Sequence, residues 1–240
     1  MRNLIRKIPG ARRAYRHVAY LWSIAHQQYF RDWKQMTDES HLRKDWNFES
    51  CIEQERHELV LAAIKKLRAD ISQANVLEIG CSDGVFTARL AESCASVTAC
   101  EISPVACELA SRRVRKFNNA VVREFDIVHE DIPDKYDIIF TMDVFEYVHG
   151  GKHFQTVVKK LLNALHPEGL LIYSGCRLLP DLQDAWWQRW FPEGGDAVMK
   201  RIASYPALRL KHWEFHPSDG MPVVGYLAHI IAVFRKNGAG

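Results

Sequence analysis

From residue 49 onward, short apolar runs alternate with segments whose apolar residues recur at helical spacing. The apolar runs, which predict buried strands, are residues 75–79, 96–102, 120–125, 136–142 and 170–174. Helices are predicted over residues 49–69, 84–93 and 151–165, and a further one from Ser103, where a serine cap precedes Pro104. Because strands that alternate with helices form βαβ units, the sequence predicts an α/β fold with a Rossmann-like, doubly wound and mostly parallel sheet.

The last third of the chain departs from this alternation. Residues 178–206 contain Trp186, Trp187 and Trp190, and the first and last of these share one face of a helix. This segment is predicted to be an insertion, which either packs onto the core or covers the substrate as a lid. Two further apolar runs, at residues 208–215 and 223–234, predict an antiparallel pair of strands at the sheet edge.

Basic residues are concentrated at the start of the chain. Residues 1–30 carry six of the 32 basic side chains and no acid, which leaves 26 basic and 29 acidic side chains in residues 31–240. A body with a net charge of −3 argues against nucleic acid as a partner, because phosphate binding needs a basic surface. Residues 1–48 are predicted to be a basic, helical extension of a domain that spans residues 49–240. Residues 1–30 either contact an anionic membrane surface or pack on the body.

The composition of the 240-residue chain, 48% hydrophobic and 25% charged, is typical of globular proteins. No apolar run approaches the ~20 residues that a membrane-spanning helix needs. The six cysteines form no C-x-x-C motif and the eleven histidines form no H-E-x-x-H motif, so no metal site is predicted. Free cysteines and the lack of a clear secretory signal favour a cytoplasmic protein.

The segment from Val76 to Gly84, Val-Leu-Glu-Ile-Gly-Cys-Ser-Asp-Gly, holds the most informative motif. The predicted strand delivers Glu78 to a turn with Gly80 and Gly84, and glycines let a ligand approach the backbone closely. Glu101 ends the next predicted strand, where a carboxylate can accept hydrogen bonds from both hydroxyls of a ribose. This pattern indicates a cofactor that contains adenosine.

The motif does not favour NAD. The dinucleotide motif G-x-G-x-x-G has glycine where Ser82 and Val85 stand here, and a pyrophosphate needs that glycine turn. An acid within the strand, at Glu78, suits a ligand that carries an ammonium group rather than phosphates. S-adenosylmethionine, with a sulfonium, an amino group and no phosphate, has this character.

The segment also resembles the first motif, E/D-x-G-x-G-x-G, of class I S-adenosylmethionine-dependent methyltransferases, with Ser82 at the middle glycine. Four further segments resemble motifs of that family at matching spacings: Glu101-Ile102, Asp126-Ile127, residues 136–148 and residues 165–172. The resemblance covers about residues 50–175 and implies the fold and the cofactor of that family.

The resemblance also implies site residues. Glu101 would bind the ribose, while Asp126 and Ile127 would meet the adenine. The implied cofactor-binding residues are Arg56, Glu78, Gly80, Ser82, Gly84, Glu101, Ile102, Asp126, Ile127, Met142 and Asp143. The alternative is that Arg56, Glu101 and Asp126 are ordinary surface charges and that Glu78 only accepts hydrogen bonds from the turn.

Residues 46–64 are similar to the entry helix of NodS-like methyltransferases, which N-methylate an amino sugar of a lipo-chitooligosaccharide. The similarity rests on Trp46-Asn-Phe48, Glu53 and Arg56. It implies that the aromatic segment lies over the cofactor and that Glu53 and Arg56 lie near its methionine end. Ile52 stands where that group has a tyrosine, and residues 144–147 also differ from that group. The similarity is therefore taken to imply the same cofactor but not the same substrate.

Glu146 and Tyr147 follow the fourth predicted strand, where the transferred methyl group should face the acceptor. An amine or hydroxyl acceptor must lose a proton, and these two residues are the candidate catalytic groups for that step. The alternative is that Glu146 is a surface acid and Tyr147 packs on the sheet.

The function predicted from the sequence is methyl transfer from S-adenosylmethionine to an N or O atom of a small-molecule or saccharide acceptor. Two alternatives remain open. One is a regulatory protein that binds the cofactor without turnover, and the other is an NAD-dependent oxidoreductase.

Overall fold

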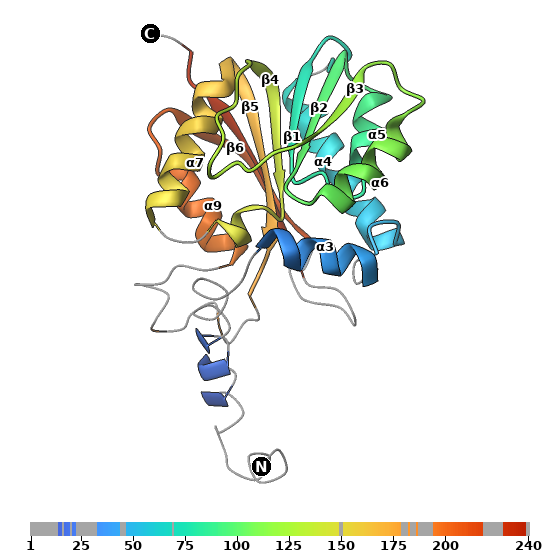
Figure 1. The fold of residues 1–240 in the computed structure, drawn as a ribbon. Coiled ribbons are helices and arrows are strands. Elements are labelled where there is room, and N and C mark those ends of the chain that lie inside the picture. Colours follow the sequence, from blue (N-terminus) through green and yellow to red (C-terminus); the bar gives the residue numbers. More distant parts are fainter. Residues whose placement is uncertain are drawn as a thin grey trace.

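The structure is a computed structural model that describes residues 14–15, 17–19, 21–22, 33–43, 47–68, 70–148, 151–178, 182, 186, 194–217 and 228–238. Within them, seven strands form one sheet in the order β3-β2-β1-β4-β5-β7-β6 (Figure 1). The strands are β1 (Asn75–Ile79), β2 (Ser96–Glu101), β3 (Ala120–Glu124), β4 (Tyr136–Met142), β5 (Leu165–Cys176), β6 (Leu208–His216) and β7 (His229–Lys236). Strands β1 to β5 pair in parallel, whereas β7 is antiparallel to β5 and β6. The predicted doubly wound sheet and its antiparallel edge pair are therefore confirmed.

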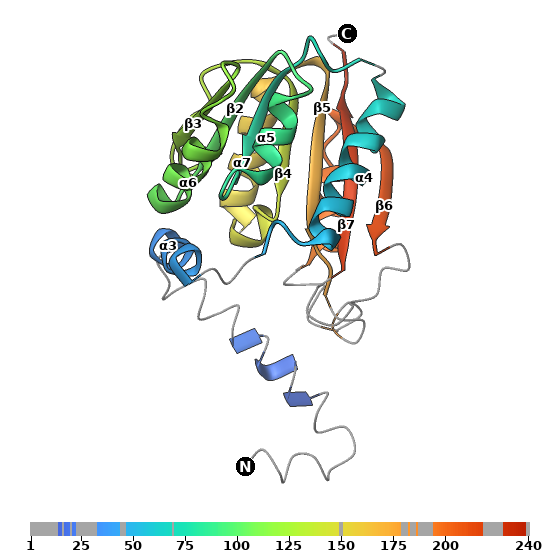
Figure 2. The ribbon, with the colours of Figure 1, turned by 90° about the vertical axis from the view of Figure 1, so that its right-hand side faces the viewer.

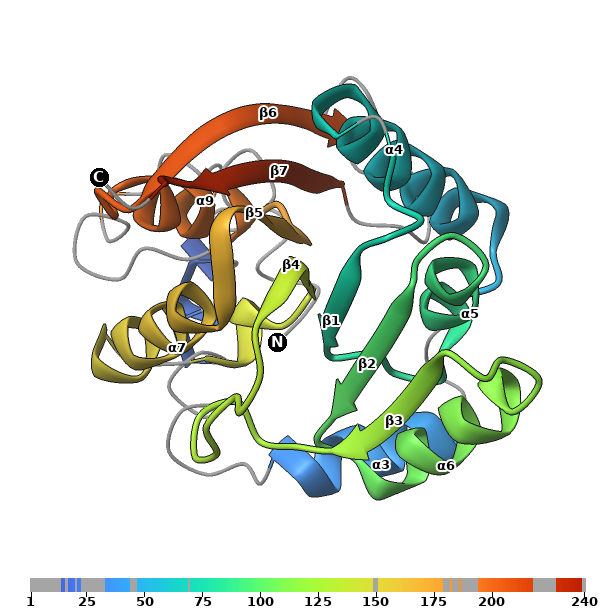
Figure 3. The ribbon, with the colours of Figure 1, turned by 90° about the horizontal axis from the view of Figure 1, so that it is seen from above.

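Helices cover both faces of this sheet (Figure 3). The helices are α3 (Trp33–Arg43), α4 (Cys51–Leu67), α5 (Val85–Ala91), α6 (Pro104–Val114), α7 (Gly151–Ala164) and α9 (Gly195–Ala203), with a short 3₁₀ turn η1 (Phe145–Tyr147). Helices α4, α5 and α6 lie on one face, and α7 and α9 lie on the other.

The core follows from the two-residue period of the strands. Neighbouring residues of β4 point to opposite faces, so Ile138 packs in the cluster that contains Ile64 of α4, and Ile139 packs in the cluster that contains Leu161 of α7. All four side chains are fully buried. A strand buried on both faces reads as a continuous apolar run, which is why β4 could be predicted from the sequence with its observed bounds.

Helix α6 begins as the sequence predicts. The Ser103 hydroxyl accepts a hydrogen bond from the Ala106 amide at 3.1 Å, and Pro104 occupies the first helical position. This cap fixes where the chain turns after β2, and so places the end of β2 beside the glycine turn that follows β1.

The sequence predicted a helical extension over residues 1–48 without placing its helices, and it predicted no helix at residues 195–203. Helix α3 lies within the N-terminal extension, across the end of the sheet that carries the carboxyl ends of β1 and β2 (Figure 2). Helix α9 lies within residues 178–206 and buries Val198 and Ile202 against the sheet. That part of the predicted insertion is therefore a helix that packs on the core, whereas most of residues 179–193 lie outside the described residues.

No described helix is long and apolar enough to span a bilayer. In the described part of the N-terminal arm, Tyr15, Val18 and Trp22 are exposed, Trp22 to 72%. The helical residues there lie away from the sheet in both side views (Figures 1 and 2). These three apolar side chains of the described part of the arm face solvent.

Candidate functional site

The predicted site residues gather where the strand order reverses. The chain winds outward from β1 through β2 to β3 and, on the other side, from β4 to β5, so β1 and β4 flank the switch point. In open α/β sheets, ligands bind in the crevice at the carboxyl ends of these strands. Glu78 is the second-last residue of β1 and Gly80 follows that strand, while Met142 ends β4 and Asp143 follows it.

The turn after β1 requires glycine at two positions. Gly80 and Gly84 have φ angles of 77° and 79°, and Ser82 between them has a φ of 51°. A Cβ on Gly80 would lie 2.6 Å from Val144 Cγ2, and one on Gly84 would lie 2.9 Å from Ala110 Cα. The turn therefore lies in close contact with Val144, which follows β4, and with Ala110 of α6. A side chain at either glycine would force one of these neighbours to shift.

Glu101 is not a surface charge. Its carboxylate is buried and accepts hydrogen bonds from the amides of Ser82 at 2.9 Å, Ile102 at 2.8 Å and Ser103 at 3.1 Å. These bonds tie the glycine turn of β1 to the end of β2. A carboxylate has about four lone-pair positions, so its oxygens can accept further hydrogen bonds from a ligand.

Glu78 is buried below the same turn. One of its oxygens accepts a hydrogen bond from the Thr87 hydroxyl at 2.7 Å. Burial raises the pKa of Glu78 to about 8. Burial disfavours the ionised form of this carboxyl, and a nearby cation would favour it.

Helix α3 adds contacts that the sequence did not predict. His41 Nε2 lies 2.8 Å from the Ser82 hydroxyl oxygen, and the Ser103 hydroxyl donates to Asp38. His41 also stacks with the half-buried Phe48, at 6.5 Å between ring centroids. Phe48 thus lies near the glycine turn, whereas Trp46 is outside the described residues. A polar helix with two such contacts gives no apolar period by which a sequence could reveal it.

Asp126 and Ile127 follow β3 beside the end of β2, as expected, but their side chains are turned to other partners. The Asp126 carboxylate accepts from the Val128 amide at 2.8 Å and lies 2.7 Å from His129 Nδ1. Burial alone would raise the pKa of Asp126, but these hydrogen bonds hold it below its usual value. Ile127 is buried in the core, so only its backbone is left to meet a ligand.

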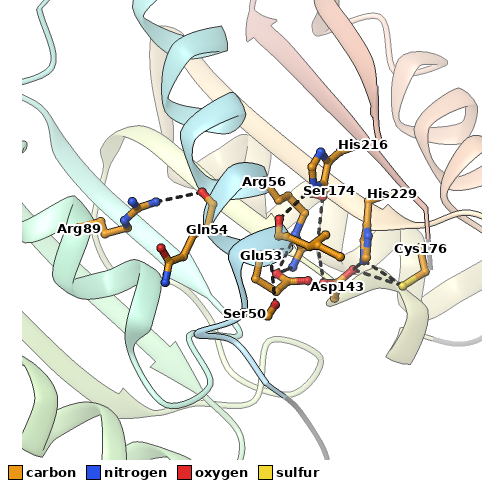
Figure 4. A network of polar contacts seen from close by, with 11 residues as sticks. Ser50, Glu53, Gln54, Arg56, Arg89, Asp143, Ser174, Cys176, His216 and His229 are labelled. Carbon is orange, nitrogen blue, oxygen red and sulfur yellow. Dashed lines mark hydrogen bonds and ion pairs between the residues drawn. The ribbon is translucent and has the colours of Figure 1, made fainter. Parts of the chain in front are cut away.

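Arg56 lies in the interior, at 2% exposure, and its guanidinium joins three elements (Figure 4). It donates to Glu53 of α4 at 2.7 and 3.0 Å, to Asp143 after β4 at 2.7 Å and to Ser174 of β5 at 3.4 Å. Burial would raise the pKa of Asp143, but Arg56 and His229 hold it well below its usual range. Asp143 adopts a left-handed φ of 55°, which aims its carboxylate at these partners.

Glu146 is half-buried on the acceptor side, and its Oε2 atom is buried. Its Oε1 accepts a hydrogen bond from the Cys176 amide at 3.0 Å, and its Oε2 has no hydrogen-bond partner among the described residues. Burial, and secondly the charge of Asp143, raise the pKa of Glu146 to about 8. The burial of Oε2 argues against the surface-acid alternative, and Oε2 is a buried acceptor with unused capacity.

Tyr147 and Trp186 are more exposed to solvent than Glu146. Tyr147 is 39% exposed at the end of η1, and burial of its hydroxyl raises its pKa. Trp186 is exposed, while Trp187 and Trp190 lie outside the described residues. Met142 is half-buried at the end of β4, paired with Ser174.

Cys176 and His229, which no sequence pattern singled out, complete this side of the site (Figure 4). Cys176 Sγ lies 3.1 Å from His229 Nε2, and the two residues face each other in the β5–β7 ladder. His229 Nε2 lies 3.3 Å from Asp143 Oδ1. The three residues are far apart in the chain, so local spacing carries no sign of their meeting.

The family model of nodulation protein S (NodS) matches residues 32–205. A nodulation protein S of Bradyrhizobium diazoefficiens is 28% identical over 141 residues, which cover 59% of this chain and 63% of that protein. A mitochondrial ubiquinone biosynthesis O-methyltransferase of Schizosaccharomyces pombe is 28% identical over 108 residues, which cover 43% of this chain and 38% of that protein. The matched segments thus span less than two thirds of either relative.

A solved structure, that of N-methyltransferase NodS from Bradyrhizobium japonicum WM9 in complex with S-adenosyl-L-homocysteine, is similar with a TM-score of 0.67 at 24% identity. The match covers 83% of this chain and 98% of that one. At this identity the likeness shows the fold, which is the Rossmann-like fold of class I methyltransferases. Because the family model matches most of its length, the chain belongs to the nodulation protein S family.

Proposed function

We propose that the protein transfers a methyl group from S-adenosylmethionine to an N or O atom of a small-molecule or saccharide acceptor. The observation that supports this best is the carboxyl-edge arrangement of Glu78, the Gly80–Gly84 turn and Glu101. It offers a buried acid for a cation, a close backbone approach and an acceptor for ribose hydroxyls, with no glycine turn suited to a pyrophosphate.

The cofactor is assigned along this edge of the sheet. Glu101 and Ile102 would hold the ribose, Asp126 and the Ile127 backbone the adenine, and the turn from Gly80 through Ser82 to Gly84 would line the middle of the molecule. Arg56, Met142 and Asp143 would lie at the methionine end, with Glu78 below the turn.

The reaction would be a displacement at the sulfonium-bound methyl carbon, with S-adenosylhomocysteine as the leaving group. Such a step depends chiefly on holding nucleophile, carbon and sulfur in line. Glu146, with its buried and unused Oε2, would accept the proton of the acceptor, and Tyr147 would help to position it. The proposal includes both nitrogen and oxygen as the methylated atom, because one similar protein is named an N-methyltransferase and another an O-methyltransferase.

Formation of S-adenosylhomocysteine tests the proposed function. Full-length protein is incubated with S-adenosylmethionine and a small-molecule extract, and the product is quantified by mass spectrometry against an extract-free control. Extract-dependent product is expected. If the cofactor binds and no extract yields product, the protein is a cofactor-binding regulator without turnover.

Loss of the Glu101 carboxylate should weaken cofactor binding. The Glu101→Ala variant removes two charge-assisted hydrogen bonds to the ribose, together worth roughly 2–4 kcal/mol, so affinity for S-adenosylhomocysteine should fall at least tenfold. Calorimetry measures the affinity and circular dichroism checks the fold. Glu108→Ala, at an exposed position of α6, is the control and should bind like wild type. An unchanged affinity in Glu101→Ala would sink this assignment.

For residues 1–30, we infer contact with an anionic membrane surface from the cytoplasmic side. The support is the acid-free, basic composition together with the exposed side chains of Tyr15, Val18 and Trp22. Residues 49–240 would form the catalytic domain, with the extension of residues 1–48 ahead of it, and the part of residues 178–206 that precedes α9 would supply its lid.

Deleting residues 1–30 should abolish sedimentation with vesicles of anionic phospholipid and leave affinity for S-adenosylhomocysteine unchanged. Binding of the full-length protein should weaken as salt rises, because screening reduces the attraction of basic side chains to the surface. If full-length protein does not sediment with such vesicles at low salt, the arm has no membrane role.

A further inference from the structure

Three potential metal ligands converge from three strands at the acceptor side of the site. Asp143 follows β4, Cys176 ends β5 and His229 begins β7, and one ligand atom of each lies within 4.8 Å of the other two. The Cys176 Sγ–His229 Nε2 distance is 3.1 Å, the His229 Nε2–Asp143 Oδ1 distance is 3.3 Å, and the Cys176 Sγ–Asp143 Oδ1 distance is 3.8 Å. Figure 4 shows the three side chains pointing toward one another.

This triangle has the size of one face of a tetrahedral zinc site. With zinc bonds of about 2.3 Å to sulfur, 2.0–2.1 Å to nitrogen and 2.0–2.2 Å to oxygen, tetrahedral ligand atoms lie about 3.4–3.6 Å apart. Each observed distance is within about 0.5 Å of that range. Small shifts of the three side chains would therefore admit an ion.

The donor types favour one class of ion. A thiolate, an imidazole and a carboxylate together suit zinc and similar transition metals, whereas magnesium and calcium prefer oxygen ligands alone. Three protein ligands are also the usual number in zinc sites that keep a fourth position for water or substrate.

The surroundings hold one ligand in the orientation that an ion needs. Arg56 donates to Asp143 Oδ2 at 2.7 Å, which leaves Oδ1 toward Cys176 and His229. A ligating carboxylate whose other oxygen is held by a hydrogen bond is a common outer-shell arrangement in metal sites. The β5–β7 pairing fixes the backbones of the other two ligands opposite each other.

We propose that Asp143, Cys176 and His229 bind a zinc-class divalent transition metal ion and leave a fourth position for water or an acceptor atom. The metal site itself does not depend on methyl transfer, and only an acceptor atom at the fourth position rests on the proposed function. On binding, the Cys176 thiol gives its proton to solvent and its thiolate sulfur bonds to the metal. An ion here would lie beside Glu146, whose Oε1 is bound to the Cys176 amide.

Cobalt(II) is the probe of choice, because a thiolate ligand gives a charge-transfer band and a tetrahedral site gives intense visible bands. Full-length, chelator-treated protein is titrated with cobalt, and about one equivalent should saturate both signals. The Cys176→Ser variant should lose the charge-transfer band, and His229→Gln should bind at least tenfold more weakly. Cys51→Ser, which removes an exposed cysteine of α4, is the control and should keep both signals.

Absence of the band in folded wild-type protein would overturn the metal site, as would its persistence in Cys176→Ser. If the variants do not fold, alkylation of the wild-type protein with and without zinc still tests the site. Zinc should protect Cys176 from alkylation by iodoacetamide and leave Cys51 reactive, as read by peptide mass spectrometry. Equal alkylation of Cys176 with and without zinc would mean that the thiol and imidazole form only a hydrogen bond.

Discussion

Replacing Glu146 by Gln is expected to lower kcat by about 10²–10⁴-fold, the usual range when a general base is removed. The substitution preserves shape, and the Gln side-chain oxygen can still accept the hydrogen bond from the Cys176 amide. Affinity for S-adenosylhomocysteine should therefore stay close to that of wild type. The loss should appear in kcat rather than in the KM for the cofactor, because the interaction belongs to the transition state.

The pH dependence of the reaction gives a second view of the same residue. A base must be ionised to accept a proton, and the pKa of Glu146 is raised to about 8. The value of kcat/KM should therefore rise with pH up to about 8 and level off above it. Any residual activity of Glu146→Gln should lack this rise, unless the acceptor's own titration causes it.

Glu168→Gln, at an exposed position of β5, is a matched control and should retain wild-type kcat. If Glu146→Gln turns over at nearly the wild-type rate, the enzyme does not use Glu146 as a base. Alignment alone would then account for the reaction, on an acceptor that arrives already deprotonated.

Replacing Arg56 by Met is expected to produce the largest loss of stability. Arg56 is buried between Glu53 and Asp143, so the substitution leaves two carboxylates beside the core without their cation. Breaking a buried ion pair in this way costs about 3–5 kcal/mol. Because the Asp143 side chain is 30% exposed, the loss should lie near 3 kcal/mol, which lowers the melting temperature by roughly 6–12 °C.

Arg112→Met provides the comparison for Arg56→Met. Arg112 pairs with Glu108 on the exposed face of α6, and such a pair contributes about 0.5 kcal/mol at most. Calorimetric or circular-dichroism melting of both variants measures the difference. If the two variants melt together, the Arg56 network does not stabilise the fold.

Contiguous features of the chain could be predicted from the sequence. Strand β4 and helix α7 carry strong apolar patterns, and the Ser103–Pro104 start signal lies within two residues, so their positions were correct to within a residue. Strand β5 is longer than predicted, since its first five residues, Leu165–Gly169, include polar and helix-breaking types. The bounds of helix α3 could not be predicted within the helical extension of residues 1–48, because its sequence is polar and its contacts lie elsewhere in the chain.

The same distinction applies to the site. Glu78, the glycine turn and Glu101 lie on adjacent strand ends within one βαβ unit, so their meeting follows from the motif and the topology. A second group of site residues comes from four elements that are distant in the chain. They are Arg56 of α4, Asp143 after β4, Cys176 of β5 and His229 of β7. Its assembly depends on the antiparallel insertion of β7 beside β5, which local spacing does not encode.

Calorimetric titration of the wild-type protein with S-adenosylhomocysteine and, separately, with NAD tests the central claim most directly. The arrangement of Glu78, the Gly80–Gly84 turn and Glu101 predicts saturable binding of S-adenosylhomocysteine at one site per chain and no heat from NAD. Binding of NAD, or no binding of S-adenosylhomocysteine by folded protein, would contradict the assignment of this edge of the sheet to a methyl-donor cofactor.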